Sequence, residues 1–117
     1  MNNPSDIIRI RVIKCNEVYF SRYAMHVLGY PVNLNFWWGE RDRVLTVSAA
    51  DAIYSCTVFA PACFYRANRT PRIRNRQLIR AIKNMMGISA DVNITVTGAY
   101  FHDHNMLVFR TADAEVY

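Results

Sequence analysis

The chain has 117 residues, a length suited to one domain covering 1–117. Apolar residues make up 52% of it and charged residues 20%, which excludes intrinsic disorder and allows a packed core. No apolar run approaches the ~20 residues of a membrane-spanning helix, and the N-terminus lacks the features of a secretory signal. We therefore expect a cytoplasmic protein with no membrane partner, and its formal charge of +5 favours a polyanionic partner.

The first half of the chain predicts strands around one short helix. Residues 7–13 alternate apolar side chains with Arg9 and Arg11, which is the period-two pattern of a half-buried strand. Ser21 has the chemistry of a helix N-cap, and Gly29 is expected to end that helix. The other strands are predicted at residues 18–20, 32–38 and 43–49, the last two joined by a polar turn at 39–42.

The second half of the chain predicts strands and a helix in the same order as the first half. Asn75 takes the place of Ser21 as a helix cap, and Gly87 takes the place of Gly29 at the helix end. The sequence after each glycine contains Val-Asn, and Ala-Asp closes each half, at residues 50–51 and 112–113. The predicted strands of this half are 54–59, 70–73, 92–96 and 106–113, with a loop around 98–105. We therefore expect two pseudo-repeat halves, residues 7–51 and 54–113.

The stretch Val18–Gly29, with sequence VYFSRYAMHVLG, carries a resemblance to a known family. A hairpin, a capped short helix ending in Leu-Gly and a second hairpin resemble the AbrB/MazE swapped-hairpin module, and two modules in one chain are similar to the arrangement in MraZ. The resemblance implies an α+β, mainly β fold in which two swapped-hairpin-like ββαββ halves form one small barrel-like domain. It also implies DNA binding through basic residues on one face.

A run of seven basic residues with no intervening acid is the candidate nucleic-acid-binding surface. On a helix that begins after Asn75, the basic residues are spaced i, i+4 and i+7, so we expect them to share one exposed face. Arginine predominates in the run, which favours bidentate contacts to phosphate or guanine. The predicted nucleic-acid-binding residues are Arg66, Arg69, Arg72, Arg74, Arg76, Arg80 and Lys83.

Two functions are compatible with this surface. The first is a small DNA-binding protein, a transcriptional regulator that contacts phosphates through the arginine-rich surface and acts as a homodimer. The alternative is a non-enzymatic protein-interaction module, such as an antitoxin-like partner or a phage-type inhibitor, that binds an acidic protein surface. Arg9 and Arg11 either extend the basic patch or solvate an edge strand, and Trp37 is a candidate dimer contact.

We expect neither an enzyme nor a bound cofactor or metal. The chain has no phosphate-binding glycine loop and no paired-carboxylate site. His102 and His104 would converge if they lay on one strand, but no third ligand stands near them, and a polar hairpin loop is the alternative. Cys15, Cys56 and Cys63 lack ligand spacing and are expected to be free thiols, mostly in the core.

Overall fold

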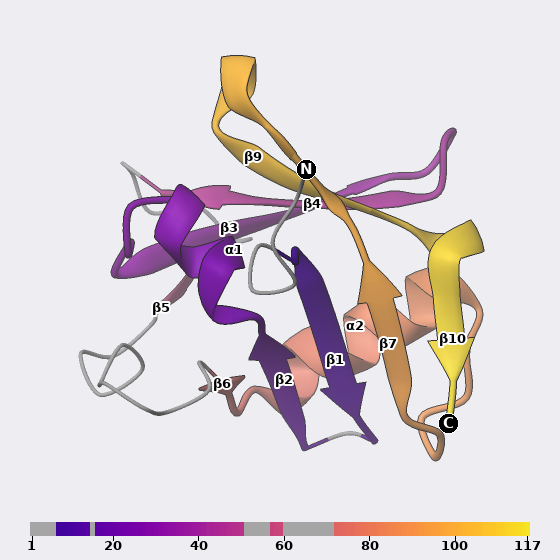
Figure 1. The fold of residues 1–117 in the computed structure, drawn as a ribbon. Helices are drawn as coiled ribbons and strands as arrows, with labels where there is room; N and C mark the ends of the chain where they lie inside the picture. The colour runs from indigo at the N-terminus through magenta and orange to yellow at the C-terminus, as the bar shows by residue number, and fades with distance from the viewer. Residues whose placement is uncertain (1–6, 15, 51–56, 60–71) are drawn as a thin grey trace.

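The computed structural model describes residues 7–14, 16–50, 57–59 and 72–117. This part of the chain is mainly β, with two sheets and two helices (Figure 1). The helices are α1 (Arg22–Val27) and α2 (Arg76–Met86), with short 3-10 turns η3 (His102–His104) and η4 (Thr111–Asp113). The strands are β1 (Arg9–Ile13), β2 (Glu17–Phe20), β3 (Asn33–Gly39), β4 (Val44–Ala49), β5 (Thr57–Phe59), β6 (Arg72–Ile73), β7 (Ile94–Thr97), β8 (Ala99–Phe101), β9 (Met106–Arg110) and β10 (Ala114–Val116).

Both sheets contain strands from both halves of the chain. The first sheet has the order β10-β7-β1-β2-β6 and the second has the order β5-β3-β4-β9-β8. In the first sheet Ile10 of β1 lies opposite Val96 of β7, and in the second Val47 of β4 lies opposite Leu107 of β9. Neither half therefore has a sheet of its own. Both sheets are open, so the expected barrel-like closure is wrong for the residues described.

The core lies between the two sheets and the helices. In the first sheet the buried side chains alternate with exposed ones, as the period-two pattern of residues 7–13 predicts. Helix α2 passes behind β1, β2 and β7 in Figure 1 and contributes Ile79, Ile82 and Met86 to the core. Phe36 of β3 lies 6.1 Å from Phe20 of β2 between ring centroids, which joins the two sheets. No helix in the described ranges has the length and apolar character needed to cross a membrane.

The two helices end in the same way. Gly29 and Gly87 have φ of 81° and 70°, the left-handed conformation that glycine adopts without strain. The amide of Tyr30 donates to the Met25 carbonyl at 3.0 Å, and that of Ile88 donates to the Lys83 carbonyl at 2.9 Å. These bonds close each helix in the Schellman pattern, so the predicted glycine stops are confirmed.

The two helix caps differ. Asn75 is confirmed as a cap, because its Oδ1 accepts a hydrogen bond from the Leu78 amide at 3.0 Å. Ser21 is at the N-cap position, but its hydroxyl makes no cap hydrogen bond. The Ser21 Oγ instead accepts from the Arg9 amide at 3.0 Å and donates to the Ile7 carbonyl at 2.6 Å. The predicted capping role of Ser21 is therefore wrong, since its side chain fixes the start of β1.

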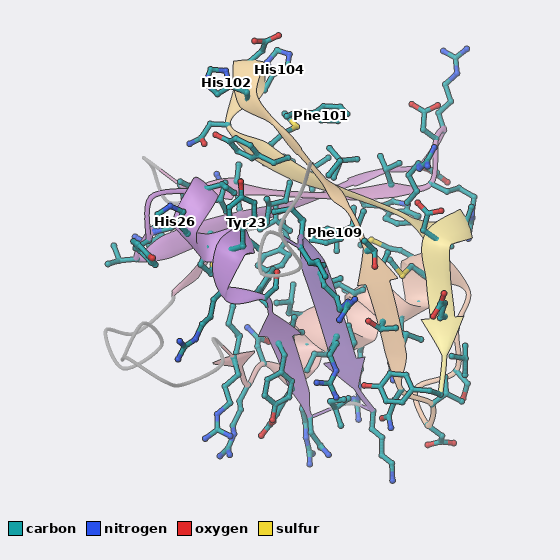
Figure 2. The ribbon with its side chains drawn as sticks, in the orientation of Figure 1. Tyr23, His26, Phe101, His102, His104 and Phe109 are labelled. Carbon is teal, nitrogen blue, oxygen red and sulfur yellow. The ribbon has the colours of Figure 1, made fainter. Side chains whose placement is uncertain are left out.

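The C-terminal region differs most from the prediction. The loop expected at 98–105 contains β8 and η3, and residues 111–113 form η4 before an additional strand, β10. At Gly98 the chain passes from β7 in the first sheet to β8 in the second. A Cβ at Gly98 would lie 2.4 Å from the Val108 carbonyl oxygen and 2.6 Å from Cδ1 of Phe109, so the crossing requires glycine. Figure 2 shows Phe109 pointing into the interior below this crossing.

Candidate nucleic-acid interface

A row of polar side chains crosses the outer face of the first sheet. Strand pairing sets Arg72 opposite Tyr19, Tyr19 opposite Arg11, and Arg11 opposite Thr95. Glu115 of β10 lies opposite Thr95 and completes the row. Because alternate residues on a strand point to opposite faces, the whole row is on the side away from the core.

Four arginines lie on this outer face, which we call the arginine face. Arg9 and Arg11 are exposed residues of β1, spaced to share one side of the strand. Arg72 joins them because β6 pairs with β2, and Arg74 follows β6 with its side chain 67% exposed. Sequence reasoning left the role of Arg9 and Arg11 open. The pairing of β2 with β6 places them on the same face as Arg72 and Arg74.

Glu17 is the acidic centre of the arginine face. Its carboxylate accepts a hydrogen bond from Arg74 Nε at 3.0 Å and from the Tyr19 hydroxyl, and it lies 3.8 Å from a terminal nitrogen of Arg72. The Tyr19 hydrogen bond and the two guanidinium groups lower the pKa of Glu17 below its ordinary value. Glu17 is therefore ionised at neutral pH and offsets part of the arginine charge.

Arg11 lies between two tyrosines. Its guanidinium carbon is 5.9 Å from the ring centroid of Tyr19 and 5.8 Å from that of Tyr117. The Arg11 Nε also donates a hydrogen bond to the Tyr117 hydroxyl at 3.1 Å. Cation–π contacts of this kind hold the guanidinium plane in a defined position. Sequence reasoning missed Tyr117 because β10, which brings it beside Arg11, had no strand pattern long enough to predict.

Two of the three predicted basic residues of α2, Arg76 and Arg80, are exposed. Arg76 is exposed beside the arginine face, where it lines a hollow of about 390 Å³ with Asn16, Glu17 and Arg74. Arg80 is exposed one turn further along and lines a different hollow. Arg66 and Arg69, the first two residues of the predicted set, lie outside the described residues.

The prediction that Lys83 faces outward is wrong. Its side chain is only 1% exposed, and its Nζ donates to the carbonyl oxygens of Ala90, at 3.0 Å, and of Val92. The buried stripe of α2 consists of Ile79, Ile82, Lys83 and Met86, whereas Met85 is 40% exposed. Lys83 is four residues after Ile79, on the buried side of α2. The segment at residues 90–92, which leads to β7, covers it.

The histidine pair lies far from the arginine face. Figure 2 shows His102 and His104 at the tip of the β8–β9 hairpin, projecting away from the rest of the protein. Among the residues that the structure describes, no group of three metal-ligating side chains comes together. The three cysteines lie outside those residues, and their predicted state stays a prediction.

Comparison with known proteins gives no relative from which to transfer a function. No family model matches the chain, and neither curated proteins nor solved structures are significantly similar to it.

We expect Glu17→Gln to strengthen polyanion binding and to change the acid sensitivity of the fold. The substitution removes the carboxylate that pairs with Arg72 and Arg74. Because the folded-state pKa of Glu17 is lowered, its ionised form stabilises the fold at neutral pH. That contribution is lost as the pH falls below the ordinary value of 4.5 and through the lowered folded-state pKa.

The measurements are urea denaturation of both proteins from neutral to acidic pH, and binding to heparin or DNA at constant salt. The difference in stability between the wild-type protein and Glu17→Gln should shrink as the pH falls. Equal affinity of the two proteins for the polyanion would show that Glu17 does not compete for the arginines.

Proposed function

We propose that this protein binds DNA through the arginine face and regulates transcription in the cytoplasm as a homodimer. The observation that carries the proposal is the convergence of Arg9, Arg11, Arg72 and Arg74 on one open sheet face, with Arg76 at its edge. Arginines spread over a sheet can contact several phosphates at once, and the counterions released favour binding.

We also propose that the two halves are repeats of a swapped-hairpin unit, as the resemblance to AbrB/MazE and MraZ implies. The two matching helix ends support this. The strand pairing supports it too, because Val12 opposes Ile94 in the first sheet and Val58 opposes Leu34 in the second. Leu34 and Ile94 each follow the Val-Asn of their own half, so the two sheets are completed by equivalent exchanges between halves.

A protein-interaction module is the second candidate function. The observation that favours it is the pairing of Arg72 and Arg74 with the carboxylate of Glu17. Arginines that already bind one carboxylate have the geometry to bind acidic side chains of a partner, as an antitoxin-like protein or a phage-type inhibitor would require.

A salt titration of binding to random duplex DNA distinguishes the two functions. For four or five phosphate contacts we expect log K to fall with log salt at a slope of about −4. The proposal fails if the protein does not bind DNA at low salt. The alternative gains support if the protein then still binds an acidic protein surface and loses that binding on Arg72→Glu.

A further inference from the structure

We infer that the arginine face binds an unpaired strand of nucleic acid, with its bases stacking beside Arg11 on Tyr117 and Tyr19. This inference rests on the proposed function and specifies the form of nucleic acid that the face prefers. It depends on the tyrosine–arginine arrangement, which a surface that only attracts phosphates does not need.

The width of the first sheet argues against reading a duplex. The row from Glu115 to Arg72 crosses five strands, and adjacent strands are about 4.8 Å apart, so the row is ~19 Å wide. The major groove of B-DNA is about 12 Å wide and admits one helix or a two-stranded ribbon. The arginine face therefore meets a duplex only at its phosphates, whereas an unpaired strand can lie along the sheet with its bases turned toward it.

Arg11, at the centre of the row, and the two tyrosines beside it have the chemistry that unpaired bases require. Tyr117 is 54% exposed, and its hydroxyl is held by the Arg11 Nε at 3.1 Å. The Arg11 guanidinium is itself planar and stacks on bases as an aromatic ring does. The Arg11 guanidinium carbon lies 5.9 Å from the Tyr19 ring centroid and 5.8 Å from that of Tyr117, so two aromatic rings flank a planar cation in the middle of the sheet.

The surrounding charges suit the backbone of such a strand. Arg9 lies on the same strand as Arg11, and Arg72 and Arg74 lie on the other side of Tyr19. Glu17 is the carboxylate that a phosphate would displace from Arg72 and Arg74. Cations that flank a stacking platform are typical of proteins that bind single strands without sequence preference.

The test compares four fluorescein-labelled ligands of about 12 nucleotides by anisotropy at one salt concentration, a length within the usual site size. They are oligo-dT, oligo-U, an abasic strand with the same number of phosphates, and a duplex. We expect the better of the two unpaired strands to bind about tenfold tighter than the abasic strand, since base–aromatic stacking is sizeable for each base.

Three variants show whether the tyrosine ring is responsible. Tyr117→Leu should remove most of the advantage over the abasic strand, whereas Tyr117→Phe should keep the advantage. Tyr30→Leu is the matched control, because Tyr30 is also an exposed tyrosine, 52% exposed, and lies between α1 and β3, outside the row. It should bind all four ligands as the wild-type protein does.

The outcomes separate this inference from the proposed function. Equal affinity for the abasic and base-bearing strands, or a Tyr117→Leu variant that keeps the preference, overturns base stacking and leaves phosphate binding intact. A duplex that binds tighter than both unpaired strands also overturns it. Failure of all four ligands to bind at low salt overturns both proposals.

Discussion

Replacing Lys83 by alanine is expected to lower the free energy of unfolding by about 3–5 kcal/mol, a large share of the stability of a small domain. The substitution removes a fully buried side chain and leaves a cavity beside Ile79 and Met86. It also leaves the Ala90 and Val92 carbonyls without their ammonium donor. Chemical denaturation followed by circular dichroism measures the loss.

Lys83→Met and Arg80→Ala are the matched variants for this experiment. Methionine restores most of the buried volume without the donor, so Lys83→Met should lose about 1–3 kcal/mol. Arg80 is exposed on the same helix, and its replacement should change stability by less than about 0.5 kcal/mol. If Lys83→Ala unfolds no more easily than Arg80→Ala, the segment leading to β7 does not depend on the Lys83 ammonium.

Reversing two charges on the arginine face should weaken DNA binding by about two orders of magnitude, since each reversal removes a phosphate contact and adds repulsion. The variant is Arg11→Glu with Arg72→Glu, which lie on either side of Tyr19 in the row. Losing two contacts should also make the salt slope shallower by about 1.8. Both arginines are exposed, but Arg72→Glu also replaces an ion-pair partner of Glu17 with a second carboxylate, so we expect a modest fall in melting temperature and no loss of the fold.

Arg41→Glu is the control for a charge reversal outside the arginine face. It changes the net charge by half as much as the double variant, and it lies in the turn between β3 and β4 of the second sheet. We expect it to reduce affinity by only a few-fold through the long-range field. If Arg76→Glu with Arg80→Glu weakens binding more than the sheet variant does, the interface is the exposed side of α2 and not the arginine face.

The sequence predicted correctly those elements that are determined by neighbouring residues in the chain. Alternation over 7–13 predicted β1, and the Asn75 and Gly87 signals predicted the two ends of α2. Each depends on the residue itself and its near neighbours. Ser21 has an equally good local signal, but its hydroxyl bonds to the remote start of β1.

The features that sequence reasoning missed depend on remote segments. Lys83 is seven residues after Arg76 but also four after Ile79, so its position on the helix fits either side of α2, and the segment at Ala90 is what covers it. β10 is three residues long and exists because β7 offers it an edge, and it carries Tyr117 to the side of Arg11.

The candidate site was therefore predictable only in part. Arg72, Arg74 and Arg76 belong to the basic run that the sequence singled out, and the structure brings them together. Their neighbours Arg9 and Arg11 come from the other half of the chain, and pairing of β2 with β6 is what joins them. A run of charges in sequence indicates a positive surface but does not show which face of the protein carries it.

The exchange of strands between halves also determines when the protein can fold during its synthesis. Ile10 must wait for Val96 to emerge from the ribosome before β1 gains its β7 neighbour. At ~5–20 residues per second the wait is roughly 4–17 seconds, and the edge of β1 that pairs with β7 has no partner throughout. We therefore expect nascent chains stalled before β7 to be protease-sensitive and to recruit chaperones, and protection to begin only when the last third of the chain has been translated.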